Sequence, residues 1–347
     1  MKLQRAYIIL AALVIIAAAA AALLLSASQA HSASRSASIV FGADGGSMNY
    51  SQMAYARSLG IRYDRLDIEM NSSFHSYVEN LTKNNISVLG IIDYRTMNVS
   101  FSPSSKGLSC ASNCNWTLGE WNSTVSNVVR AYPMIHVWEI WNEPQFPEFQ
   151  DGFNNGSVHN YYLMLKSAYT RIKAYNPNDT VLCLGGDNIY EGGGTPWMYG
   201  YYWAEQLWGY GAGKYCSAIS LHAYTGFEYL PSQVPYGSSR SVGSVFNQSL
   251  SMYENLTGKP IWITEVGMPS NNLTEIAPGL TSSYAKQSEF LNQTFSLFAS
   301  KPYVAGIFWF NINGYIDRPY NLSMGLFTKN FTPKPALYAF RSYEDKN

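Results

Sequence analysis

The sequence predicts an α/β protein built as a single (β/α)8 TIM barrel. Short runs rich in β-branched and aromatic residues alternate with longer stretches whose apolar residues recur at spacings of three and four. Such alternation implies a parallel sheet, and eight units in about 310 residues fit a closed barrel. The eight predicted strands are residues 38–45, 61–70, 86–94, 135–143, 180–187, 217–224, 260–267 and 303–312.

The predicted helices are clearest in residues 157–176 and 283–300, which are followed by Asn-Pro at 176–177 and Lys-Pro at 301–302. Proline does not continue a helix, so both stretches end where a loop to the next strand is needed. A doubly wound sheet is the rival architecture, and it usually carries a glycine-rich phosphate loop after an early strand. The run Gly42-Ala43-Asp44-Gly45-Gly46 lacks that spacing, which favours the barrel.

Residues 1–25 are predicted to be a signal peptide or a transmembrane anchor. Lys2 and Arg5 precede an uncharged run from Tyr7 to Leu25, which is just long enough to span a bilayer as a helix. Ser28-Gln29-Ala30 would serve as a cleavage site after a signal peptide. Both alternatives therefore stay open, and in either case the rest of the chain is expected to face outward.

A Ser-rich linker, residues 26–38, leads from this segment to the barrel domain, residues 39–347. We expect that domain to be extracellular or at the cell surface, attached to the membrane if the first segment is not cleaved. Fifteen Asn-x-Ser/Thr sequons between Asn49 and Asn330 agree with a glycosylated exterior. A composition that is simply rich in Asn and Ser is the alternative explanation.

The four cysteines, Cys110, Cys114, Cys183 and Cys216, are predicted to form disulfides in such a compartment. Four cysteines allow three connectivities. Cys110 with Cys114 would close a tight loop and leave Cys183 with Cys216, although spacing alone does not fix the pairing. A zinc site is disfavoured, because Cys-x3-Cys without a nearby histidine is a poor metal motif.

The charge balance argues against a nucleic-acid partner. Only 13% of the residues are charged and the formal net charge is zero, whereas 47% are hydrophobic. A chain of this composition can bury a sizeable core but lacks the basic face that binds phosphate backbones. We expect a monomer.

Two glutamates are the candidate catalytic residues, because the carboxyl ends of the strands build the active site of such a barrel. Glu143 ends the fourth predicted strand and Glu265 ends the seventh, so they can face each other across the mouth. Glycoside hydrolysis needs one protonated and one ionised carboxyl group. A single glutamate after an apolar strand is more often a solvated strand end, but two at matching positions favour catalysis.

The residues around this pair suggest how it is supported. Arg65 and Tyr224 could hold Glu265 as an anion, and Trp309 would offer its ring to a sugar. Strict alternation along the fourth strand presents a difficulty, because it places Glu143 on the face of Glu139, with the intervening amide opposite. Both can serve one site only if the strand curls before Pro144; Glu139 would then be a buried partner of Arg65 or, in a shifted register, the acid itself.

The motifs WNEP at 141–144 and ITEVG at 263–267 resemble those of the clan A retaining glycosidases, which include glycoside hydrolase families 5 and 39. The resemblance covers nearly everything after residue 38. It implies that Glu143 is the acid/base and Glu265 the nucleophile. It also implies supporting roles for Asn142 at the sugar 2-hydroxyl, Arg65 beside the nucleophile, His222 and Tyr224 of the strand-six motif, and Trp309 on strand eight.

The resemblance implies a retaining O-glycosyl hydrolase that cleaves β-glycosidic bonds of poly- or oligosaccharides and requires neither a metal nor an organic cofactor. Strand three ends in Asp93-Tyr94, where many members of family 5 carry a histidine, so the sugar is not identified. The alternatives are a catalytically inactive barrel that binds glycan and a glycoprotein of the cell envelope. The second of these predicts repeats and long Ser/Thr-rich stalks, which the sequence lacks.

Overall fold

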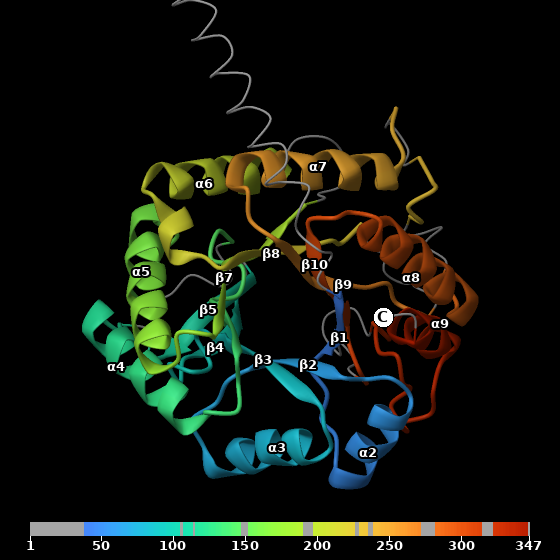
Figure 1. The fold of residues 1–347 in the computed structure, drawn as a ribbon, viewed down its shortest axis with the longest axis horizontal. Coiled ribbons are helices and arrows are strands. Elements are labelled where there is room, and N and C mark those ends of the chain that lie inside the picture. Colours follow the sequence, from blue (N-terminus) through green and yellow to red (C-terminus); the bar gives the residue numbers. More distant parts are fainter. Residues whose placement is uncertain are drawn as a thin grey trace, which may run out of the picture. The chain divides into compact units, whose positions relative to one another are not determined.

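Eight parallel strands close into a barrel in the computed structural model of the chain (Figure 1). The ring follows the order of the chain, and the last strand pairs with the first. The (β/α)8 fold class and all eight predicted strands are confirmed. The barrel strands are β1 (Val40–Asp44), β2 (Tyr63–Asp67), β3 (Ser87–Ile92), β6 (Val137–Ile140), β7 (Thr180–Asn188), β8 (Ala218–His222), β9 (Ile261–Val266) and β10 (Val304–Phe310).

The structure describes residues 38–104, 107–113, 115–146, 152–189, 197–225, 229–234, 239–271, 282–313 and 322–345, with the backbone alone for 100–111 and 197–199. The predicted signal peptide or anchor and nearly all of the linker lie outside these residues. None of the helices within them combines the length and apolarity that a membrane crossing requires.

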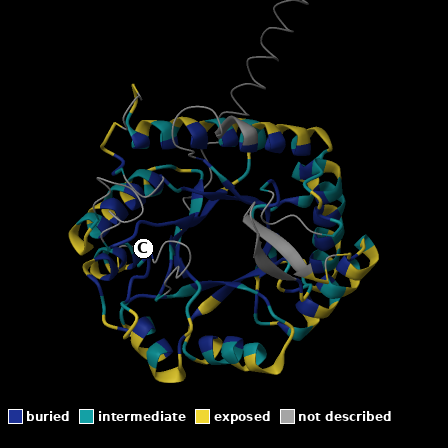
Figure 2. Ribbon diagram, turned by 180° about the vertical axis from the view of Figure 1, so that it is seen from behind, coloured by how far each residue is buried: buried dark blue, intermediate teal, exposed yellow. Residues whose placement is uncertain are grey.

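Helices surround the barrel and bury one face against it. Figure 2 shows buried residues on the strands and on the inner helix faces, with exposed residues outside. The predicted helices at 157–176 and 283–300 are confirmed as α5 (Val158–Tyr175) and α8 (Tyr284–Ala299). The other elements are α2 (Tyr50–Ser58), α3 (Ser72–Lys83), α4 (Leu118–Ala131), α6 (Trp197–Gly209), the 3₁₀ helix η2 (Ala212–Tyr215), α7 (Val242–Thr257), α9 (Pro335–Glu344) and the hairpin β4 (Ser100–Ser104) with β5 (Gly107–Ser112).

Local sequence signals set where the helices begin. Asn49 and Gln52 form a capping box at α2, and Thr117 and Glu120 form another at α4. In each, two backbone N–H groups that have no partner inside the helix are satisfied by side chains. The helices therefore start at fixed points just after the loops at the strand ends.

A small apolar cluster fills the barrel below the site. It combines aromatic and aliphatic side chains, and the rings of Trp262 and Phe308 stack with centroids 5.9 Å apart. Gly42 and Gly306 make room for these rings, because a Cβ atom at either position would overlap Phe308 or Trp262. This apolar cluster excludes water beneath the polar residues at the strand ends. Its buried members are Leu89, Ile91, Leu182, Ala218, Trp262 and Phe308.

One predicted disulfide is confirmed: Cys183 of β7 bonds Cys216, which follows η2, with Cα atoms 5.7 Å apart. The two residues are 33 positions apart in the chain, so the bond closes a long loop across two barrel units. The side chains of Cys110 and Cys114 lie outside the described residues, and their pairing stays a prediction.

Replacing both Cys183 and Cys216 by Ala should lower the free energy of unfolding by about 2–4 kcal/mol, because a loop of this length loses its closure in the unfolded chain. Urea denaturation of the oxidised wild type and the variant would measure the difference. The double Ser variant is the control for polarity, since both positions are buried. Equal stabilities of wild type and double Ala variant would contradict the prediction.

Candidate active site

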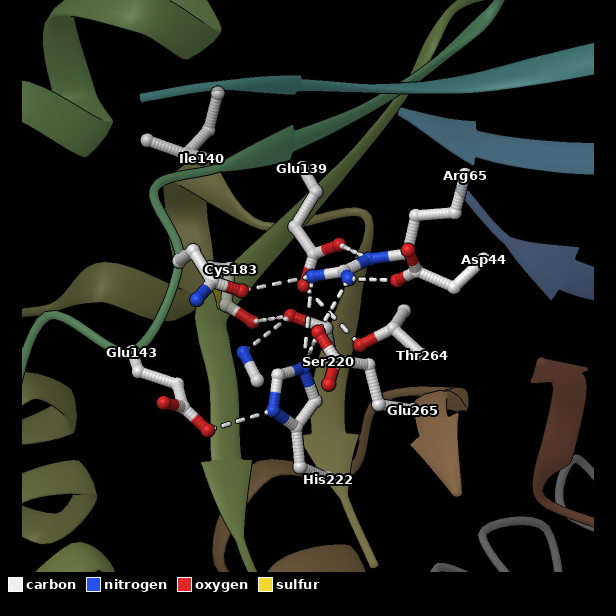
Figure 3. A network of polar contacts seen from close by, with 12 residues as sticks. Asp44, Arg65, Glu139, Ile140, Glu143, Cys183, Ser220, His222, Thr264 and Glu265 are labelled. Carbon is white, nitrogen blue, oxygen red and sulfur yellow. Dashed lines mark hydrogen bonds and ion pairs between the residues drawn. The ribbon is translucent and has the colours of Figure 1, made fainter. Parts of the chain in front are cut away.

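Arg65 joins four strands at the end of the barrel where the predicted site residues gather (Figure 3). It lies on β2 and is 2% exposed. Its Nε donates to Glu139 Oε2 on β6 at 2.6 Å, and its Nη1 donates to Glu265 Oε1 on β9 at 2.5 Å and to Asp44 Oδ2 on β1. One buried guanidinium thus binds three carboxyl groups. It can do so because it is planar and carries several N–H donors in a fixed geometry.

Glu265 is held at both carboxylate oxygens. Beside its bond to Arg65, Oε1 lies 3.4 Å from His222 Nε2. The hydroxyl of Tyr224 donates to Oε2 at 2.5 Å. Donors on both oxygens favour the ionised form and fix the orientation of the carboxylate.

Glu143 meets the same histidine from the other side. His222 Nδ1 lies 2.8 Å from Glu143 Oε1, and the imidazole is fully buried. The two carboxyl groups therefore contact the two different nitrogens of one imidazole ring, which lies between them. This is the meeting of two distant glutamates that the sequence predicted.

The end of β6 turns Asn142 and Glu143 toward one site by leaving the extended conformation. Trp141 has φ 68° and Glu143 has φ 46°, both in the left-handed region. Strand alternation stops there, and Asn142 Oδ1 accepts from Arg65 Nη2 at 3.0 Å. The curl expected before Pro144 is present, and Glu139 is the buried partner of Arg65.

A bulge in β7 supports this turn and the histidine. Gly185 and Gly186 have φ of 60° and 80°, and the backbone N–H of Glu143 donates to Gly185 O at 2.5 Å. The backbone of Gly186 lies against the imidazole, so that a Cβ atom there would overlap His222 Nε2. Glycine at 186 is therefore needed for both its conformation and its lack of a side chain.

The carboxyl groups of the site have opposite pKa shifts. Burial raises the pKa of Glu143, and the hydrogen bond and charge of His222 lower it only in part. Burial also acts to raise the pKa of Glu265, but His222, Arg65 and the Tyr224 hydroxyl outweigh it, and the net shift is downward. Glu143 is thus set to keep a proton at a pH where Glu265 is an anion.

His222 and Asp44 complete the charge balance. Burial lowers the pKa of His222, but Glu265 and Glu143 raise it by more, and the net direction is upward. Burial raises the pKa of Asp44 to about 8, with Arg65 opposing and Glu265 adding to the shift. Asp44 and Glu143, whose pKa values are raised, therefore keep a proton to a higher pH than Glu265, whose pKa is lowered.

Trp309 requires a correction, because its ring does not reach the site. It is fully buried on the outer side of β10, where it packs against Phe290 and Phe295 of α8 and its Nε1 donates to Met324 O at 3.1 Å. Side chains of a strand alternate, and the neighbouring Phe310 is the one on the inner face. Its half-buried ring lies 6.2 Å from that of Tyr224.

Sequence reasoning also missed Asp44. It ends β1, is 9% exposed, and pairs in register with Arg65 of β2 and Phe310 of β10. Its signal was an acidic residue at the carboxyl end of the first predicted strand, beside the strand of Arg65. These residues line a cavity of about 800 Å³, with Asp67 and Asn311 among its other walls.

The described residues contain no three His, Cys, Asp or Glu side chains arranged to hold a metal ion. Glu143, His222 and Glu265 form a chain in which the histidine already occupies the space between the carboxyl groups. The arrangement can supply an acid and a nucleophile that are coupled through one imidazole.

Solved structures with this fold include several carbohydrate-active enzymes. A family 39 glycoside hydrolase from Bacteroides cellulosilyticus is 19% identical, with a TM-score of 0.58 over 88% of this chain and 63% of its own, so the chain spans less than two thirds of that protein. Xylanase 10B from Thermotoga maritima is 14% identical, with a TM-score of 0.59 over 89% and 95%. Fungal β-1,4-galactanases are 13% identical, with a TM-score of 0.64 over 88% and 99%.

At these identities the likeness concerns the fold alone. A comparison with curated proteins found no match. The model of the family described as glycosyl hydrolase catalytic core matches residues 113–335, which is well over half of the chain. The chain therefore belongs to the glycosyl hydrolase catalytic core family, which agrees with the resemblance to glycoside hydrolases that its motifs predicted.

Proposed function

We propose that this protein is a retaining glycosidase that hydrolyses β-linked poly- or oligosaccharides by double displacement. Glu143 acts as acid/base and Glu265 as nucleophile. The observation that carries the proposal is the pair of carboxyl groups on opposite nitrogens of His222, with pKa values shifted in opposite directions. Retention needs two carboxyl groups close together, one protonated and one ionised.

In the first step Glu265 attacks the anomeric carbon, and Glu143 donates its proton to the departing glycosidic oxygen. The resulting glycosyl ester on Glu265 is then displaced by water. Glu143, now ionised, takes a proton from that water, and the sugar leaves with its original configuration. Because Glu143 Oε1 faces His222, its other oxygen is the one that carries the transferred proton.

We also propose that the enzyme works outside the cytosol. The disulfide between Cys183 and Cys216 supports this, because such bonds persist in oxidising compartments. None of the sequon asparagines in the described residues is buried, which supports their use as glycosylation sites. Mass spectrometry of the protein from its native source would detect the glycans and show whether residues 1–25 remain attached.

Glu143→Gln and Glu265→Gln should each lower kcat/KM toward aryl β-glycosides by at least about 10³-fold, because each removes a proton donor or a nucleophile. A panel of aryl glycosides measured with purified protein tests this. Glu79→Gln, on the exposed face of α3, is the control for loss of a carboxylate and should leave the rate unchanged. NMR of the first product should show retained configuration; an inverted product would exclude the double displacement.

The pH profile should respond to His222 in a particular direction. Activity is lost as the pH falls through the pKa of Glu265 and as it rises through that of Glu143, which gives a bell shape. His222 lowers both pKa values, so His222→Asn should move both limbs of kcat/KM to higher pH, by about one unit. Limbs that stay in place, or move in opposite directions, would argue against this electrostatic role.

Gly186→Ala should reduce kcat/KM by about tenfold or more, because its Cβ displaces the imidazole that contacts both glutamates. Gly211 is a matched control: its φ of 85° is close to the 80° of Gly186, but nothing lies within 4 Å of a Cβ atom there. Gly211→Ala should lose similar stability through backbone strain and keep its activity. Thermal melting and kinetics of both variants would separate the two effects, and equal activity losses would refute the assignment.

A further inference from the structure

A cavity at the strand ends is lined by Asp44, whose carboxyl group has no role in the proposed mechanism. This cavity, of about 800 Å³, is lined at one end by Asp44, Arg65 and Phe310. Arg65 bonds Glu265, and the ring of Phe310 contacts that of Tyr224, which also bonds Glu265. Two residues of the cavity wall thus contact the nucleophile or the tyrosine that bonds it, so a sugar held at Glu265 would lie next to this wall.

Asp44 uses only one of its oxygens within the protein. Oδ2 accepts from Arg65, whereas Oδ1 has no hydrogen-bond donor among the described residues. The side chain keeps 12% of its surface exposed, and it lies in the wall of the cavity. Oδ1 is thus a polar atom at the edge of a mostly buried carboxyl group, and it is accessible from the space that the substrate enters.

Holding Arg65 does not by itself explain Asp44. The guanidinium already binds Glu139 through Nε, Glu265 through Nη1 and Asn142 through Nη2. A third carboxyl group on one cation adds desolvation and repulsion that the same cation offsets only in part. A ligand hydroxyl that bonds Oδ1 would supply the missing partner.

The neighbours of Asp44 fit a pyranose ring. Its register partner Phe310 presents a half-buried aromatic ring at the same level of the barrel, and such rings pack against the apolar face of a sugar. A hydroxyl at the rim of that sugar would then be directed at a carboxyl group, which can accept from it or, when protonated, donate to it.

We propose that Asp44 is a substrate-contacting residue that determines glycone specificity: its Oδ1 hydrogen-bonds a hydroxyl of the sugar bound over Glu265, while Oδ2 rests on Arg65. This rests on the proposed glycosidase function. The contact selects for a sugar that carries a hydroxyl at that position, because a site built to bond a hydroxyl rejects an analogue that lacks it.

The test compares wild type and Asp44→Ala on an aryl β-glycoside that the wild type hydrolyses and on the series of its monodeoxy analogues. The variant should lose about 10–100-fold in kcat/KM on the parent sugar and less than about threefold on one analogue, the one that lacks the contacted hydroxyl. Asp44→Asn, which keeps an oxygen acceptor and an N–H donor, should recover part of the loss.

Glu79→Gln is the control for loss of a carboxylate, because Glu79 lies on the exposed face of α3, pairs with Lys83 and does not line the cavity. It should show no preference among the analogues. A uniform loss over all analogues in Asp44→Ala would overturn the proposal and leave only support of Arg65; wild-type rates on every sugar would overturn it too.

Folding and function are separated within the same experiment. Thermal melting shows whether Asp44→Ala folds. If it does not, the nearly isosteric Asp44→Asn replaces it in the test, and a uniform loss over all analogues or wild-type rates on every sugar would again overturn the proposal. If Glu265→Gln hydrolyses the parent glycoside as fast as wild type, the proposed function fails. If Glu265→Gln is inactive and Asp44→Ala shows no analogue dependence, the failure belongs to Asp44 alone.

Discussion

The site depends on one buried cation. Arg65 lies at the centre of the polar layer and receives a carboxyl group from each of three other strands, β1, β6 and β9. Directly below it, the rings of Trp262 and Phe308 exclude water from the barrel. Charges in such surroundings are costly unless each is paired, so removing this guanidinium would leave carboxylates buried without compensation. The position of Glu265 therefore depends on the contacts that Arg65 makes between strands of the closed barrel.

The same crowding separates the two glutamates chemically. Glu265 accepts from Arg65 and Tyr224 and has its pKa lowered. Within the described part of the chain the carboxyl group of Glu143 bonds His222 alone, and burial raises its pKa. Identical side chains thus acquire different proton affinities from different numbers of donors. His222 couples them, because a proton or charge on its ring acts on both carboxyl groups at once.

Much of this was accessible from the sequence, because strand ends in a parallel barrel converge on one face. That rule placed Glu143, Glu265, Arg65 and His222 together without any knowledge of side-chain geometry. The prediction failed at Trp309, because we followed the family resemblance and not the alternation of side chains along β10. The side chains that point into the barrel from this strand are those of Phe308 and Phe310. Asp44 was missed although it ends the strand next to that of Arg65, because a lone acid at a strand end does not by itself distinguish a partner of Arg65 from a solvated strand end.

The sequence required a break in alternation at the end of β6, but no periodic pattern predicts the backbone conformation that makes it. The run from Trp138 to Trp141 is apolar because three of its side chains pack outward into the core, while Glu139 points to Arg65. Placing the next two residues in the site requires left-handed backbone at two non-glycine positions, which costs about 1–2 kcal/mol at each. Burial of the Trp141 ring against Trp116 and Trp121, and the backbone bond from Glu143 to Gly185 of β7, offset that cost. Contacts with two neighbouring units of the barrel therefore stabilise the strained backbone. Because this backbone is fixed, Glu143 has little freedom to turn away from the imidazole of His222.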